Sequence, residues 1–108
     1  MAKSTRNTSD LLDLAEVDRV VHEPARLMIL MVLYSVDGAD FTFLLNTTEL
    51  TWGNLSSHVT KLEEAGYVKV KKDFVGKKPR TMVQLTAAGR RAIDTYRNTM
   101  QDALKNLR

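Results

Sequence analysis

Apolar residues along the chain recur with helical spacing in five segments and alternate with polar residues in one. In residues 9–21 they fall three and four positions apart, which predicts an amphipathic helix capped by Ser9 or Asp10. Residues 24–36 are apolar on nearly every side, so a second helix should be buried on most faces at the centre of the core. Pro24 suits the first turn of that helix.

Two further helices follow in the middle of the chain. Asp40 is a favourable N-cap for residues 41–47, a short helix that should turn Phe43 and Leu44 toward the core. Residues 51–65 then combine one apolar stripe with a polar opposite face, and Gly66 marks their end. The inward stripe consists of Leu55, Val59 and Leu62, to which Ala65 can add.

A hairpin and a last helix complete the pattern. In residues 67–72 valines and lysines alternate, which predicts a strand with a solvated basic face. Residues 73–79 contain a glycine and a proline and predict a loop, after which residues 80–85 return as a second strand. Thr86 caps a helix over residues 87–107. Residues 1–8 are polar and should form a disordered tail on a single domain that spans residues 1–108.

Composition excludes several classes of protein. The chain is 44% hydrophobic and 27% charged, as ordinary globular domains are, and it has no cysteine for a disulfide, a thiolate metal site or thiol catalysis. No apolar run approaches the length of a membrane span, and the N-terminus lacks the apolar stretch of a secretion signal. We therefore expect a cytoplasmic protein without membrane contact. No catalytic constellation can be assembled from its side chains, so we expect no enzyme, no cofactor and no metal site.

Positive charge is concentrated in the predicted hairpin. The net charge of the whole chain is +3. Residues 67–80 hold six basic side chains and one acidic one, a net charge of +5, so the remaining chain is negative. Cations gathered on one projecting element favour contact with an anionic partner such as DNA, although lysines also protect sheet edges from aggregation.

Four segments in this order resemble the small winged helix-turn-helix regulators of the MarR and ArsR type. Residues 22–30 (HEPARLMIL) are similar to a helix opening of the family, and residues 50–58 (LTWGNLSSH) to the start of its recognition helix. Residues 62–68 (LEEAGYV) resemble its helix-to-wing junction, and residues 85–90 (LTAAGR) the exit from the wing. The likeness extends over residues 17–97.

The resemblance and the residue pattern together imply a mostly helical α+β fold, a winged helix-turn-helix with a two- or three-stranded antiparallel wing. Double-stranded DNA is the expected partner, with residues 51–65 as recognition helix in the major groove and residues 67–85 as wing on the backbone or minor groove. The predicted DNA contacts are Thr51, Trp52, Gly53, Asn54, Ser56, Ser57, His58, Thr60, Lys61, Lys71, Lys72, Lys77, Lys78 and Arg80.

Two positions depart from the family pattern. Glu49 stands where the helix-turn-helix turn usually has glycine, and a positive φ there would cost on the order of 1 kcal/mol. Trp52 stands where a small or polar residue is usual. It can stack on DNA, insert as an apolar wedge, or close the start of its own helix by packing, and we favour packing.

The terminal helices carry more apolar surface than a core of this size can cover. We interpret this surface as the interface of a homodimer, as the resemblance implies, with packing of the two helices within one chain as the alternative. The predicted interface consists of Leu11, Leu14, Val17, Val21, Ile93, Tyr96, Met100, Leu104 and Leu107. A dimer would bind a pseudo-palindromic operator, and the resemblance favours repression.

Two questions stay open at the level of sequence. MarR-like proteins often hold small aromatic ligands beside the dimer helices, and the side chains that can line such a pocket here are Met28, Met31, Tyr34 and Met100. The same methionines are also ordinary core fillers, so an effector is neither required nor identified. The rival to a DNA-binding regulator is a winged-helix adaptor that binds proteins and makes no DNA contact.

Overall fold

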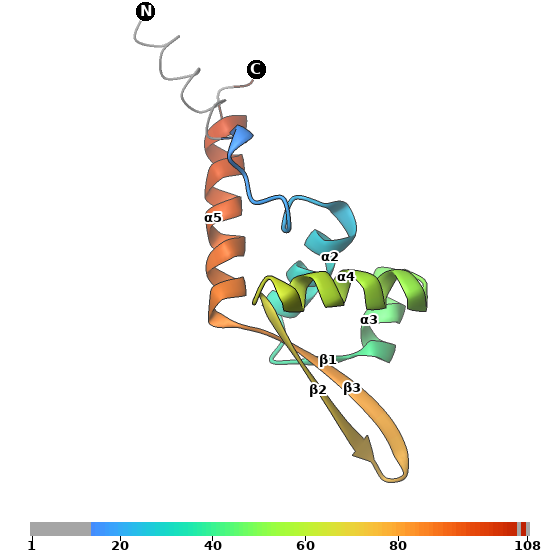
Figure 1. Cartoon of the computed structure of the whole chain (residues 1–108). Coiled ribbons are helices and arrows are strands. Elements are labelled where there is room, and N and C mark those ends of the chain that lie inside the picture. Colours follow the sequence, from blue (N-terminus) through green and yellow to red (C-terminus); the bar gives the residue numbers. More distant parts are fainter. Residues whose placement is uncertain (1–13, 106, 108) are drawn as a thin grey trace, which may run out of the picture.

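The computed structural model shows a helical body from which a two-stranded ribbon projects (Figure 1). It describes residues 14–105 and 107. In chain order its elements are α2 (Pro24–Tyr34), β1 (Ala39–Asp40), α3 (Phe41–Thr48), α4 (Trp52–Glu64), β2 (Val68–Val75), β3 (Lys78–Leu85) and α5 (Ala87–Leu104). The strands form one antiparallel sheet in the order β1-β3-β2. The expected mostly helical winged helix fold is confirmed.

Side-chain caps fix where the helices begin, as predicted. Asp40 Oδ1 accepts a hydrogen bond at 2.8 Å from a backbone amide in the first turn of α3. Thr51 does the same for α4 at 3.2 Å and Thr86 for α5 at 3.0 Å. Each bond satisfies an amide that has no partner within its own helix. Gly66, with φ of 81°, follows the end of α4, as expected.

The helix predicted for residues 9–21 does not reach Val21. Leu14 and Ala15 are helical, but residues 16–23 run through turns and bends. Asp18 explains the break, because its carboxylate accepts hydrogen bonds from the backbone amides of Val20 and Val21 and so holds a turn. Leu11, the rest of residues 9–13 and the predicted tail lie outside the described residues.

The core lies between α2, α3, α4 and the base of the sheet. Its fully buried side chains are Val21, Ile29, Leu30, Leu33, Leu44, Leu55, Leu62 and Val83. The predicted inward stripe of α4 is confirmed. Most residues of α2 are buried or half-buried, as predicted, but Met28 and Met31 are exposed. The helix presents one face to the core and one to the surface.

The helix-turn-helix is formed by α3, a short turn and α4. Thr48 holds the turn, since its hydroxyl donates to the carbonyl of Leu44 and accepts from the amide of Leu50. Glu49 adopts the left-handed conformation with φ of 59°, the strained geometry expected where glycine is usual. Phe43 does not face the core as predicted: its side chain is 45% exposed on the outer side of α3.

The wing is longer and its turn tighter than the sequence predicted. Residues 73–79 do not form a loop, because β2 continues to Val75 and β3 begins at Lys78. The connection is the two-residue turn of Gly76 and Lys77, and Gly76 has the positive φ (65°) that a hairpin turn needs at its first central position. A ribbon of eight-residue strands therefore extends well beyond the helices (Figure 1).

Candidate nucleic-acid interface

The polar face of α4 is exposed, as a recognition helix requires. Asn54, Ser57 and Lys61 are exposed, and Ser56 is half-buried. The hydroxyl of Thr60 donates to the carbonyl of Ser56 at 2.9 Å, which leaves the lone pairs of that hydroxyl available to a ligand. Amide and hydroxyl groups of this kind can bind base edges or phosphates in the major groove.

Trp52 covers the start of α4 by packing on α3. Its ring lies 5.0 Å from the ring of Phe41, centroid to centroid, with a tilt of 57°. Packing, the role favoured from the sequence, is therefore one of its roles, and its partner is Phe41. Trp52 also stays 59% exposed, so one side of the indole remains available on the surface beside the polar face of α4.

The His58 ring contacts the start of α2 through its Nδ1 atom. Its Nδ1 lies 3.2 Å from Arg26 Nη1 and 3.3 Å from Glu23 Oε2. Arg26 also donates to the carbonyls of Val20 and Arg19. The predicted DNA contact is thus the centre of a cluster that ties α4 to the start of α2 and to the segment before it.

The same cluster keeps Glu23 ionised. Partial burial raises the pKa of its carboxyl group, but hydrogen bonds from the amides of Ala25 and Arg26, together with the charges of His58 and Arg26, outweigh that effect. The net result is a pKa below the ordinary value of 4.5. Glu23 therefore caps α2 as a carboxylate, which the positive end of the helix dipole favours.

The wing cations lie on both faces of the ribbon. Successive residues of a strand alternate in direction, so Lys72 continues the row that begins at Val68 and Val70, whereas Lys71 belongs to the opposite row. Lys72 and Thr81 line a cleft between the wing and α4. Lys77 lies in the turn, where both faces meet. Cations are thus present in the turn and in the cleft, which Glu63 also lines, while Lys71 points away from the helix side.

Arg80 is already bound within the wing. Its Nε and Nη2 donate to the two carboxylate oxygens of Asp73 at 2.9 and 2.8 Å, a two-point contact between paired residues of the hairpin. This guanidinium holds the pKa of the Asp73 carboxyl below its usual value. Arg80, one of the predicted DNA contacts, therefore does not present an unengaged guanidinium to DNA.

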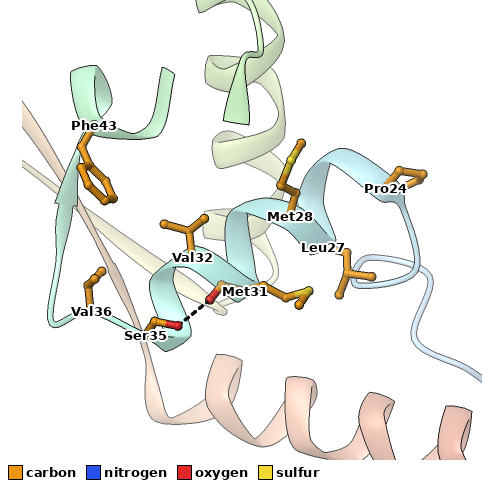
Figure 2. Close-up of a pocket in the computed structure, with 8 residues that line it drawn as sticks. All are labelled: Pro24, Leu27, Met28, Met31, Val32, Ser35, Val36 and Phe43. Atoms are coloured by element: carbon orange, nitrogen blue, oxygen red, sulfur yellow. Dashed lines mark hydrogen bonds between the residues drawn. The ribbon is translucent and has the colours of Figure 1, made fainter. Parts of the chain in front are cut away.

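An open apolar groove runs along the outer side of α2 (Figure 2). The exposed side chains of Met28 and Met31 line it, with Phe43 at its far side from α3. A second groove of about 400 Å³ lies between α2 and α5 and includes Met31, Tyr34 and Met100. The four residues named for an effector pocket thus lie on grooves at the surface, divided between two sites.

The residues predicted for a dimer interface have different environments. Val21 and Ile93 lie in the protomer's own core, and the hydroxyl of Tyr96 lies 2.8 Å from His22 Nδ1. The surplus apolar surface inferred for these positions is therefore used within one chain. Leu104 and Leu107 are exposed near the far end of α5, which extends away from the wing (Figure 1). Leu14, Val17 and Met100 are half-buried.

Comparison with known proteins identifies the class. Residues 25–104 match the model of the winged helix DNA-binding domain, and the chain belongs to this family. An uncharacterised protein of Methanocaldococcus jannaschii is 33% identical over 89 residues, which cover 82% of this chain and 97% of that protein. The predicted family resemblance is confirmed: the chain is a winged helix transcriptional regulator, not an enzyme.

Solved structures agree with that class. The structure of a transcriptional regulator homologue from Pyrococcus horikoshii matches with a TM-score of 0.82 and 30% identity, over 88% of this chain and 96% of that one. A MarR-family regulator from Silicibacter pomeroyi shares the fold with a TM-score of 0.58 and 20% identity, over 98% and 71% of the two chains. Within the described residues, no helix has the length and apolar character needed to cross a bilayer.

Several residues that shape this surface carry no sequence signal. Arg26 and His58 are 32 positions apart in the sequence. Whether the guanidinium of Arg26 reaches the ring of His58 depends on how α2 crosses α4. Asp73 was predicted to lie in a loop, and the position of a loop residue relative to Arg80 is not fixed by strand pairing. Only the correct hairpin register, in which the two residues are opposite each other, would have revealed this contact.

Proposed function

We propose that this protein is a homodimeric, sequence-specific regulator of transcription that represses by occupying a pseudo-palindromic operator. Residues 51–65 enter the major groove, and the wing binds the backbone or minor groove. Two recognition helices in one dimer would reach successive major grooves about 34 Å apart. The observation that carries this proposal is the exposed polar face of α4 beside a projecting cationic ribbon.

Roles within the surface follow from side-chain chemistry. Asn54 and Ser57 are suited to base edges, because an amide or hydroxyl can read donors and acceptors in the groove. Lys72, Lys77 and Lys78 are suited to phosphates, which position the protein without reading sequence. His58 and Arg80 support the surface from within, since both are held by neighbouring side chains.

A selection from random-sequence duplexes tests the proposal. We expect enriched duplexes with two inverted half-sites, bound with a log–log salt slope near −7 if each protomer neutralises about four phosphates. Replacing Lys77 and Lys78 by alanine should weaken all duplexes alike and flatten the slope. Asn54→Ala should instead change which bases are preferred. Equal affinity at two salt concentrations would contradict the proposal.

The adaptor alternative predicts a different outcome of the same experiment. An adaptor would retain no duplex even at low salt, and it would co-purify with a protein partner. The net charge of +5 on residues 67–80 argues against it, because a protein-binding wing has no need of such a concentration of cations. The sequence identified no effector, and thermal shifts with aromatic acids would test whether either groove binds one.

A further inference from the structure

The tip of the wing is apolar, although the ribbon is basic along its length. Phe74 is 70% exposed and Val75 is 56% exposed. Pro79 is the cross-strand partner of Phe74 and is exposed as well. Side chains directly opposite each other in an antiparallel pair have Cβ atoms about 5 Å apart, so Phe74 and Pro79 form one apolar patch.

This patch continues the face of the ribbon that begins under the helices. Val68 is buried, Val70 is half-buried, Lys72 lines the cleft beside α4, and Phe74 ends the row. Phe74 lies four residues beyond Val70, and a strand rises about 3.3 Å per residue, so Phe74 lies roughly 13 Å further along the ribbon than Val70. No other part of the described chain covers it, as its exposure shows.

An exposed phenylalanine is unexpected at this position. β2 is an edge strand, and edge strands are usually protected by charges because apolar edges promote aggregation. Here Lys69, Lys71 and Lys72 protect the inner part of the strand, whereas the outermost residues are Phe74 and Val75. Retaining apolar side chains at the point farthest from the core suggests that they contact a partner.

The charges around the patch indicate what that partner is. Lys77 and Lys78 lie immediately beside it in the turn and at the start of β3. Arg80, the side chain otherwise suited to a narrow groove, is held by Asp73. A narrow ribbon with an apolar end and flanking cations fits the floor and walls of a DNA minor groove, where apolar side chains can contact sugars or wedge between base steps.

We propose that Phe74, backed by Pro79, is an apolar minor-groove contact that adds affinity and sequence preference at the flanks of the operator. This inference rests on the DNA binding of the proposed function. Lys77 and Lys78 bind the phosphates on either side, and Phe74 contacts deoxyribose and base edges between them. Because the minor groove of G·C pairs carries an amino group that A·T pairs lack, the contact favours A·T pairs.

The experiment compares Phe74→Ala with Phe43→Ala and Lys77→Ala. Phe43→Ala is the matched control, since it is the same substitution at an exposed site on α3. Each variant is titrated with the duplex obtained by selection, over a range of salt concentrations. A second duplex carries inosine in place of guanine in its flanks, which removes the minor-groove amino group and leaves the major-groove acceptors intact.

The proposal predicts a distinctive pattern. Phe74→Ala weakens binding about tenfold at every salt concentration with an unchanged slope, because an apolar contact releases no counterions. Lys77→Ala flattens the slope by about 1.8, because a dimer loses one phosphate contact from each protomer. The wild type binds the inosine duplex more tightly than the guanine duplex, and Phe74→Ala loses this difference. Phe43→Ala behaves as the wild type.

Three results would overturn the proposal, and they can be told apart. If Phe74→Ala binds both duplexes as the wild type does, the patch makes no DNA contact although the regulator assignment stands. If its slope flattens as that of Lys77→Ala does, the substitution acts through the neighbouring lysines. If the wild type binds no duplex but binds anionic phospholipid vesicles in a Phe74-dependent way, the partner is a membrane and the regulator proposal fails with it.

Discussion

Gly89 lies where the first turn of α5 crosses the start of the wing. A Cβ atom at this position would meet the carbonyl oxygen of Tyr67 at 2.1 Å and a methyl group of Leu85 at 2.8 Å. Since the first of these is a backbone atom, the helix and the wing would have to separate. The close approach sets the angle at which the wing leaves the body, so this glycine belongs to the architecture of the DNA-binding surface.

Gly89→Ala is therefore expected to destabilise the fold by about 2 kcal/mol, the cost of forcing an atom into packed surroundings. For a chain of this size the melting temperature should fall by roughly 4 °C for each kcal/mol. Gly53→Ala is the matched control, because a Cβ atom there meets nothing within 4 Å and should stabilise α4 slightly. Equal melting temperatures for the two variants would contradict this account.

Glu23 makes stability depend on pH. Its pKa in the folded protein lies below the ordinary 4.5, so its stabilising effect is present above that value and is lost as pH falls through the folded pKa. Glu23→Gln should lower the free energy of unfolding at pH 7 by about 0.5–1 kcal/mol, since it removes a charge at the helix N-terminus. Denaturant titrations should show this difference shrinking toward pH 3. A difference that stays constant with pH would exclude the carboxylate as its source.

For single residues, the sequence predicted which side chains of α4 are exposed, but it did not predict which side chains contact one another. The period of α4 placed Asn54, Ser57 and Lys61 on the exposed face, because a helix repeats every 3.6 residues whatever its context. The same period placed His58 beside that face but said nothing of Glu23 and Arg26, which come from another helix. Contacts between segments that are distant in the sequence depend on the angle at which their helices cross, and this angle cannot be derived from a single sequence.

At the scale of elements, the Asp73–Arg80 pair locks the outer half of the wing while cancelling one of its positive charges. Asp73→Asn should release the guanidinium of Arg80 for a phosphate. We expect tighter DNA binding and a log–log salt slope steeper by about 1.8, one additional phosphate contact in each of the two protomers. Fluorescence anisotropy at several salt concentrations measures both quantities.

Glu16→Gln is the control for that variant. It changes the net charge by the same amount at an exposed position in the segment before α2, and it frees no arginine. If Asp73→Asn and Glu16→Gln raise affinity equally, general electrostatics explains the effect. If Asp73→Asn weakens binding, the pair is needed to hold the shape of the wing rather than to restrain Arg80.

The bounds of helices and strands were predicted best where a single local residue determines them. The caps Asp40, Thr51 and Thr86 begin α3, α4 and α5 as expected, because a cap acts on amides of its own first turn. The hairpin turn was misplaced because Pro79 was interpreted as a breaker. β1 pairs with β3 only at Val83 and Met82, so the outer edge of β3 has no neighbour beside Pro79, and its missing N–H costs no ladder bond.

At the scale of the whole molecule, the wing and the far end of α5 extend in different directions from the helical body (Figure 1). The wing carries the cations, and the end of α5 carries the exposed Leu104 and Leu107. This division matches a protein that binds DNA at one end and a second copy at the other. Charge and surplus apolar residues in the sequence predicted both ends, but two residues of the predicted dimer interface, Val21 and Ile93, are buried in the core.

The proposed dimer is tested by placing charge on that surface. Leu104→Glu combined with Leu107→Glu should give a folded monomer, since both side chains are exposed and the core that holds Ile93 is untouched. Sedimentation should then show half the mass, and affinity for a selected two-half-site duplex should fall steeply because one recognition helix binds alone. Affinity for a single half-site should change little. Phe43→Glu places the same charge on an exposed apolar position outside this surface and should leave the mass unchanged. A double variant that keeps both the wild-type mass and its operator affinity would show that the two copies meet elsewhere, or that one copy suffices.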